Sequence, residues 1–408
     1  MKKEMYARLL IRVGLNVKKN QLVIIKAPVE VYDFVQLLSK EAFECGAKDV
    51  IVKYRDEKIS HQRYMYANQE VFESIPSYEA DFYNQTSEQG ACYLTLVGEN
   101  PDLMKDIDTK KMISYSRDFR KKTKAYRNRL DFMECQWCIG AVATKDWAKK
   151  VFPDLNEEEA VNSLWEDIFH VCRVNEDPVK TWSERKVDFE KKVSILNNLQ
   201  LKTLHYTNSL GTDCTVELPK GYQFAGGGSL LKDGTYYFPN LPTEECFSAP
   251  YKYGVNGKLV SSYPLNYNGS LIQDFWFVFK DGKVIDFGAK EGKDVLESIL
   301  KTDENSSYLG EIALVPYDSA ISSLHRIFYE TLIDENASCH FALGQSYAEC
   351  IESGLTMTEE ELLSKGMNQS MTHVDFMVGT SDLKITAFTE NNEEILIFDQ
   401  GSFSSVFS

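Results

Sequence analysis

The first half of the chain alternates short β-rich runs with longer segments that carry apolar residues at helical spacing. The β-rich runs lie at 21–28, 49–54, 91–97 and 136–143. The segments with helical spacing lie at 5–15, 29–45 and 101–126, and a charged helical segment follows at 157–196. Strands that alternate with helices in this way predict βαβ units, in which helices cover a parallel sheet.

After residue 201 the pattern changes, and strand-like runs such as 203–208 and 215–218 dominate. Turn signals separate these runs, at 226–228, 232–234, 255–257 and 280–282. Asn-Gly and Asp-Gly between β-rich runs indicate hairpins. Helical spacing returns at 291–301, 319–333 and 358–366.

The chain length points to more than one hydrophobic core, because 408 residues exceed the usual size of a single domain. We therefore predict an α/β protein of two domains. Residues 1–190 are expected to form an N-terminal α/β domain with a parallel sheet. Residues 191–408 are expected to form a C-terminal domain of mixed, strand-rich α+β structure.

The composition adds limits on compartment and partners. Apolar residues make up 43% of the chain and charged residues 26%, which is typical of a soluble globular protein. A formal net charge of −16 argues against nucleic acid and anionic membranes as partners, since both require basic surfaces. Nine scattered cysteines, charges throughout the first twelve residues and the lack of a long apolar run favour a cytoplasmic location without a membrane span.

The candidate chemistry lies in the second half of the chain. His373 and Asp375 are two residues apart in an apolar, β-branched context, so on a strand their side chains would share a face. Further carboxylate and imidazole donors precede them, at Glu245, Glu311, Glu335 and His340. Such donors suit zinc, cobalt or manganese, and many carboxylates together can hold two ions. The set therefore suggests metal-assisted hydrolysis.

Each candidate also has an ordinary structural explanation. Glu244 and Glu245 are adjacent, so only one of them could enter a given pocket on a strand, and both could lie in a solvated loop. Glu311 begins an apolar strand, where it either meets a compensating cation or lies at an exposed edge. His340 could be a hydrogen-bonded structural histidine, and it would share a face with Tyr347 if the segment were helical, although Gly344 makes a turn equally plausible. The joint occurrence with His373 and Asp375 favours ligation.

Four segments resemble a known family. They are 240–245 (NLPTEE), 309–316 (LGEIALVP), 334–344 (DENASCHFALG) and 372–379 (THVDFMVG). In this order they resemble the thermophilic metallo-aminopeptidases, a family that includes aminopeptidases T and S and the streptococcal PepS. The resemblance runs along the whole chain. One departure is Asn305, where the family pattern is expected to carry a glycine.

The resemblance implies a homodimeric, two-domain enzyme that releases N-terminal amino acids from peptides with a free N-terminus. It also implies two divalent ions, as zinc, cobalt, manganese or magnesium, in the C-terminal domain. Their ligands map onto Glu245, Glu311, Glu335, His340, His373 and Asp375. Tyr347 matches the family's active-site tyrosine. On this basis Glu311 is expected to bridge the ions, a water between them to act as the nucleophile, and Tyr347 to donate a hydrogen bond to the reacting carbonyl oxygen.

Two other functions remain open. A different two-metal hydrolase, such as a phosphatase or a deacetylase, could use the same donors, although the acidic composition makes phosphate esters less attractive. A peptide-binding protein without turnover could use the same scaffold.

Overall fold

The computed structural model describes residues 1–267 and 269–408, and the chain in it divides into two compact units. The N-terminal unit comprises Met1–Glu184 and Gly228–Pro242, and the C-terminal unit comprises Arg185–Gly227 and Thr243–Ser408. Within the described part of the chain, none of the helices has the length and apolar character needed to span a lipid bilayer.

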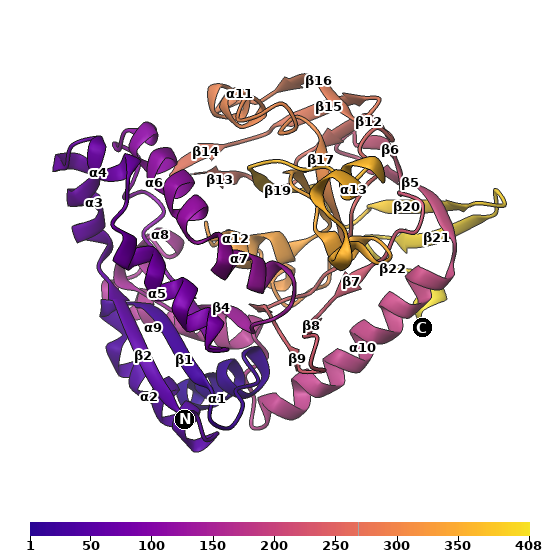
Figure 1. Ribbon diagram of the computed structural model, residues 1–408. Helices are drawn as coiled ribbons and strands as arrows, with labels where there is room; N and C mark the ends of the chain where they lie inside the picture. Colours follow the sequence, from indigo (N-terminus) through magenta and orange to yellow (C-terminus); the bar gives the residue numbers. More distant parts are fainter. Residues whose placement is uncertain (268) are drawn as a thin grey trace. The chain divides into compact units, whose positions relative to one another are not determined.

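The N-terminal unit contains the predicted parallel sheet, with strand order β10-β4-β3-β1-β2. Its strands β1, β2 and β4 are labelled in Figure 1. Its strands are β1 (Leu22–Pro28), β2 (Asp49–Arg55), β3 (Cys92–Val97), β4 (Trp137–Ala141) and β10 (Asn240–Leu241). Its helices are α1 (Lys2–Leu9), the π-helix η1 (Leu10–Gly14), η2 (Val29–Val31), α2 (Tyr32–Glu44), α3 (Glu57–Tyr66), α4 (Glu70–Glu73), α5 (Ser77–Glu88), α6 (Thr109–Lys122), α7 (Lys124–Asp131), α8 (Lys145–Val151) and α9 (Glu157–Val171).

Helices cover the buried strands of this sheet through aromatic contacts. Tyr83 of α5 and residues of α6 and α7 pack with Ile24 of β1 and Tyr93 of β3 in one apolar cluster. A second aromatic group joins Tyr6 of α1 to Phe34 of α2, with ring centroids 5.5 Å apart, and the Tyr6 hydroxyl donates a hydrogen bond to the carbonyl oxygen of Ala141. Burial of this kind is why β1 and β3 read as nearly continuous apolar runs.

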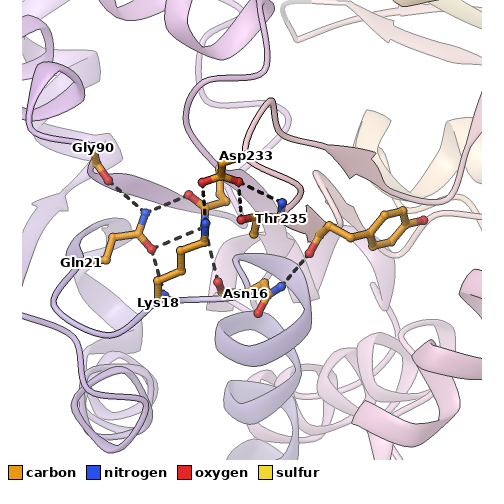
Figure 2. A network of polar contacts seen from close by, with 8 residues as sticks. Asn16, Lys18, Gln21, Gly90, Asp233 and Thr235 are labelled. Carbon is orange, nitrogen blue, oxygen red and sulfur yellow. Dashed lines mark hydrogen bonds and ion pairs between the residues drawn. The ribbon is translucent and has the colours of Figure 1, made fainter.

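The segment 228–242 belongs to the N-terminal unit, whereas the sequence-based division placed it with residues 191–408. Its short strands β8 (Ser229–Leu230) and β9 (Tyr236–Tyr237) form a hairpin, and β10 then pairs in parallel with β4. Figure 2 shows the polar contacts that hold this hairpin: Asn16 Nδ2 donates to the carbonyl oxygen of Tyr236 at 2.8 Å, and Lys18 Nζ lies 2.6 Å from Asp233 Oδ2. The division itself falls inside the long helix α10 (Pro178–Asn198), close to the expected residue 190.

The C-terminal unit is built on two antiparallel sheets. The first, here called the site sheet, has the order β19-β18-β17-β11-β7, and the second has the order β16-β15-β12-β6-β5-β20-β21-β22. The strands of the site sheet are β7 (Ala225–Gly226), β11 (Cys246–Ser248), β17 (Leu309–Leu314), β18 (His340–Gly344) and β19 (His373–Met377). Those of the second sheet are β5 (Leu201–Thr207), β6 (Asp213–Glu217), β12 (Val255–Val260), β15 (Trp276–Lys280), β16 (Lys283–Gly288), β20 (Lys384–Thr389), β21 (Glu394–Asp399) and β22 (Ser402–Phe403).

Shorter elements connect these strands. The hairpin of β13 (Leu265–Tyr267) and β14 (Ser270–Ile272) stands outside both sheets. The helices of this unit are α11 (Lys293–Leu300), η3 (Ser322–Leu324), α12 (Thr331–Asp334), η4 (Glu335–Ala337), η5 (Ala348–Cys350), η6 (Gly354–Thr356), α13 (Glu359–Ser364) and η7 (Ser405–Phe407), besides most of α10. The protein is thus a mixed α/β structure with one parallel sheet and further antiparallel sheets, which confirms the predicted fold class.

The core of the C-terminal unit lies between its two sheets. Tyr206 of β5 meets Phe341 of β18 with ring centroids 5.0 Å apart, and Phe277 of β15 meets Phe376 of β19 at 5.1 Å. These four rings belong to one buried apolar cluster that takes side chains from both sheets. Side chains alternate along a strand. The residues directly before and after Phe341 in β18, and directly before and after Phe376 in β19, therefore face away from this core.

Two local expectations are wrong. The segment 319–333 is not a continuous helix, because His325 and Tyr329 have positive φ and the Asp334 carboxylate accepts the backbone N–H groups of Phe328 and Glu330. Asn256-Gly257 is not a hairpin turn but lies inside β12, where a Cβ on Gly257 would come within 2.2 Å of the carbonyl oxygen of Asp213. That glycine permits the close approach of β12 and β6.

Candidate metal centre

The register of the site sheet brings the candidate residues of three strands together. Glu311 of β17 pairs with Ala342 of β18, and Ala342 pairs with Asp375 of β19. His340 and His373 lie two positions from Ala342 and Asp375 respectively, so their side chains share the same face. This is the face opposite to Phe341 and Phe376, and therefore opposite to the core.

Glu245 and Glu335 approach this face from the ends of other elements. Glu245 directly precedes β11, which pairs with β17, and Glu335 begins η4. Possible ligand atoms of Glu245, Glu311 and His340 all lie within 4.8 Å of one another, and so do those of Glu311, His373 and Asp375. Glu335 is in neither group, but it lines a small pocket together with Asp375.

The contacts within the cluster connect each imidazole to carboxylates. His340 Nε2 lies 3.2 Å from Glu245 Oε2 and 3.8 Å from Glu311 Oε1. His373 Nε2 lies 3.1 Å from Glu311 Oε2 and 3.2 Å from Asp375 Oδ1. Glu311 therefore stands between the two groups and presents one oxygen to each imidazole.

Backbone carbonyls orient both imidazole rings. His373 Nδ1 lies 2.8 Å from the carbonyl oxygen of Gln345, and His340 Nδ1 lies 3.3 Å from that of Ser338. In each ring an Nδ1–H can donate to the carbonyl, which leaves Nε2 directed at the carboxylates. Histidines that bind metals commonly have this arrangement, because the second hydrogen bond sets the tautomer and the ring orientation.

The electrostatics of the cluster show how strongly it attracts positive charge. Although burial lowers the pKa of His340, the hydrogen bond and charge of Glu245 raise it to about 10. Burial and then the charge of Asp375 raise the pKa of Glu335 well above its usual value. Burial likewise raises the pKa of Glu311, against the opposing effect of His373. Carboxylates this deeply buried are costly unless cations compensate them.

Comparison with known proteins agrees with this geometry. A family model described as thermophilic metalloprotease (M29) matches residues 1–403. Aminopeptidase AmpS of Bacillus subtilis is 42% identical over 400 residues, which cover 98% of this chain and 97% of that protein. The chain belongs to the M29 metalloprotease family. This confirms the resemblance drawn from the four sequence segments.

Other members of the M29 family give the same result. Aminopeptidase T of Thermus aquaticus is 37% identical over 399 residues, covering 97% of this chain and 96% of that protein. The solved structure of wild-type AmpT from Thermus thermophilus superposes with a TM-score of 0.92 at 34% identity, over 98% of both chains. A metalloprotease family implies a divalent metal, and the two imidazoles and three carboxylates of the two groups described above fit such an ion by their chemistry.

Small residues leave room for ligands on this face of the M29 fold. Ala342 lies between Glu311 and Asp375 in the register and is fully buried. Gly344 pairs with His373, and a Cβ on it would come within 2.2 Å of the carbonyl oxygen of Thr372, with its φ at +105°. Larger side chains at these positions would occupy the space between the candidate ligands or push β18 away from β19.

Tyr347 lies at the edge of the cluster. It lies between β18 and η5, outside both elements, and its ring is 4.9 Å from the ring of His373 and 6.1 Å from that of Phe247. Its side chain is 44% exposed, so a ligand can reach it. The charge of His373 lowers the pKa of Tyr347, but desolvation of its hydroxyl end and the charge of Glu311 outweigh this and raise the pKa overall, so the hydroxyl keeps its proton and can donate a hydrogen bond.

Three residues near the cluster were not found by sequence reasoning, or were found in another role. Glu244, the acid adjacent to Glu245, forms an ion pair with Arg185, with Nη2 and Oε2 2.6 Å apart. Glu349 lies two residues after Tyr347, and burial followed by the charges of Glu311 and Glu245 raises its pKa to about 7. Asn336 hydrogen-bonds to the Glu335 carboxylate. The contacts of Glu244 and Glu349 join segments distant in sequence, so no local pattern points to them.

Proposed function

We propose that this metallo-aminopeptidase releases N-terminal amino acids from peptides with two divalent ions held on the site sheet. The M29 family and the aminopeptidases among its relatives support a hydrolase of peptide bonds. The donor set supports the proposed ligands, which are Glu245, Glu311, Glu335, His340, His373 and Asp375.

The observation that carries the proposal of two ions is the position of Glu311. Its Oε1 faces His340 and its Oε2 faces His373, and each imidazole has a further carboxylate beside it. A carboxylate shared between two such groups is the usual bridging ligand of a two-metal site. A single-ion site would need no second imidazole and carboxylate on the far side of Glu311.

The roles of the protein groups follow from their positions. When bound, the two ions would activate a water between them and polarise the scissile carbonyl. Glu311 would hold both ions in register. Tyr347, exposed beside His373, would donate a hydrogen bond to the carbonyl oxygen as negative charge develops on it, a contribution of roughly 2.7–4 kcal/mol for one such donor in other enzymes.

Metal stoichiometry tests the shared role of Glu311. The wild-type protein is expected to bind two ions, measured by elemental analysis after chelator treatment and reloading with zinc or cobalt. The Glu311→Gln variant is expected to lose affinity for both ions, whereas Glu291→Gln, which changes an exposed acid of the same unit, is expected to keep both. A single tightly bound ion in the wild type, or an unchanged stoichiometry in Glu311→Gln, would overturn the two-ion arrangement.

Substrate assays test the reaction class. Chelator-stripped protein would be supplied singly with zinc, cobalt, manganese or magnesium and offered a panel of aminoacyl-naphthylamides and short peptides. Metal-restored cleavage that is blocked by N-acetylation of the substrate is the expected result, because an aminopeptidase requires a free amine. Cleavage of phosphate or N-acetyl substrates instead would favour another hydrolase, and ion binding without turnover of any substrate would favour a non-catalytic peptide-binding protein.

The family resemblance also predicts a homodimer, the composition predicts a cytoplasmic location, and both stay predictions. Light scattering on the metal-loaded protein measures its mass in solution, and a mass twice that of the 46.7 kDa chain is expected.

A further inference from the structure

Asn336 has a fully buried side-chain amide beside the cluster. It hydrogen-bonds to the segment before Glu245 and to Glu335. Its Oδ1 accepts a hydrogen bond from the backbone N–H of Glu244 at 2.7 Å. Its Nδ2 lies 3.3 Å from Glu335 Oε1 and 3.2 Å from the carbonyl oxygen of Leu332. One side chain thus uses both its acceptor and its donor group.

These bonds act on two candidate ligands that are distant in sequence. The peptide bonded to Oδ1 lies one residue before Glu245, so the bond determines where β11 begins and where Glu245 can place its carboxylate. The bond from Nδ2 occupies one oxygen of Glu335 and leaves the other for a ligand role. Ser319 donates to the backbone carbonyl of Asn336 at 3.2 Å and so holds the turn that carries both Asn336 and Glu335.

We propose that Asn336 is a positioning residue that holds Glu335 and the approach to Glu245 in their ligating arrangement and thereby sets the affinity of the protein for divalent ions. This inference rests on the proposed metal site. An amide suits the position because aspartate has no donor for Glu335, and an aliphatic side chain would leave the Glu244 N–H without its acceptor. Loss of comparable supporting hydrogen bonds in other proteins weakens metal binding by 10- to 100-fold.

Asn197 provides a matched control in the same unit. Its side chain also accepts and donates one backbone hydrogen bond each, with Oδ1 2.6 Å from the Phe224 nitrogen and Nδ2 3.0 Å from the Phe224 carbonyl oxygen. Both asparagines therefore stabilise the backbone, but Asn336 alone of the pair contacts a candidate ligand. Asn197→Ala is expected to lower the unfolding midpoint and leave metal affinity unchanged.

The experiment measures Co²⁺ binding by competition with a chelating dye, together with the visible absorption of bound Co²⁺, in stripped full-length protein. Asn336→Ala is expected to weaken Co²⁺ binding about 10- to 100-fold and to alter the absorption band. Asn336→Leu, which fills the volume, serves if the alanine variant does not fold, and the same loss is expected.

A double-mutant cycle separates positioning from general destabilisation. If Asn336 acts partly through Glu335, then Asn336→Ala should cost much less affinity in a Glu335→Ala background than in the wild type. Equal costs in both backgrounds, or a lowered unfolding midpoint with unchanged Co²⁺ affinity, would overturn the proposal. If Asn336→Ala weakens Co²⁺ binding but the wild-type protein cleaves no aminoacyl substrate, the proposed activity is rejected and the positioning role is kept.

Discussion

Removal of one partner of the Arg185–Glu244 ion pair is predicted to destabilise the C-terminal unit substantially. The guanidinium and carboxylate are 17% and 4% exposed, and Arg185 Nη2 also donates to the Thr243 carbonyl oxygen at 3.3 Å. The guanidinium further lies 5.0 Å from the ring of Phe189. Because Glu244 precedes Glu245, this pair fixes the chain at the approach to the candidate metal centre.

The expected magnitude follows from burial. Breaking a buried ion pair from one side costs about 3–5 kcal/mol, because the remaining charge stays desolvated. Arg185→Met leaves the Glu244 carboxylate, which is 4% exposed, without this partner, so a loss of about 3–5 kcal/mol is expected. Replacing both partners, as in Arg185→Met with Glu244→Leu, removes the unpaired charge and is expected to recover all but roughly 1 kcal/mol.

The assay must report on this unit alone, because four of the five tryptophans lie in the N-terminal unit. Hydrogen exchange of peptides from β11 and β17 gives the local free energy of opening in each variant. Lys192→Met on the same helix is the control, since its partner Asp188 is 50% exposed and the loss should stay below about 1 kcal/mol. A loss this small for Arg185→Met, or additive losses in the double variant, would refute the reasoning.

Three further predictions concern other parts of the structure. Tyr347→Phe should retain metal and lower kcat roughly 100- to 1,000-fold, and release of metal instead would make Tyr347 a ligand. Ala342→Leu should crowd the flanking candidate ligands and lower metal content, measured by elemental analysis with Ala342→Gly as the control. Lys18, followed by Thr235, lowers the pKa of Asp233 to about 2, so the stabilisation from Asp233 is present above about pH 4 and is lost as the pH falls towards 2. In the wild type, the protection of segment 228–242 against hydrogen exchange should fall over this pH range, and in Asp233→Asn it should no longer do so. A fall that persists in the variant would show that another group causes it.

Local periodicity was sufficient to predict the fold class, and distant contacts explain where it failed. Strands β1 and β3 are mostly buried, and their sequences are apolar runs between helical segments. The return of 228–242 to the N-terminal unit depends on the pairing of β10 with β4, about 100 residues away, which no turn signal encodes. The irregular path of 319–333 depends on Asp334, whose carboxylate replaces helical hydrogen-bond partners.

The candidate site shows the same division. The spacing of His373 and Asp375 was enough to predict a shared strand face, and β19 has that geometry. Arg185 and Asn336 support the cluster by contacts with a segment that is far away in the sequence. An arginine in a helix or an asparagine in a loop is common, so the local sequence does not single out either residue. Their functions are defined only by the partners that tertiary structure brings to them.

Charge balance links these observations. Two divalent ions would carry four positive charges, which equals the charge of the carboxylates of Glu245, Glu311, Glu335 and Asp375 when both imidazoles are neutral ligands. A fifth carboxylate on this buried face would leave a net negative charge and raise the cost of desolvation. Two further acids lie close to the cluster. Glu244 is neutralised by Arg185, and burial followed by the charges of Glu311 and Glu245 raises the pKa of Glu349 to about 7, so that its carboxyl takes up a proton more readily than a free one. Both arrangements limit the negative charge beside the proposed metal centre.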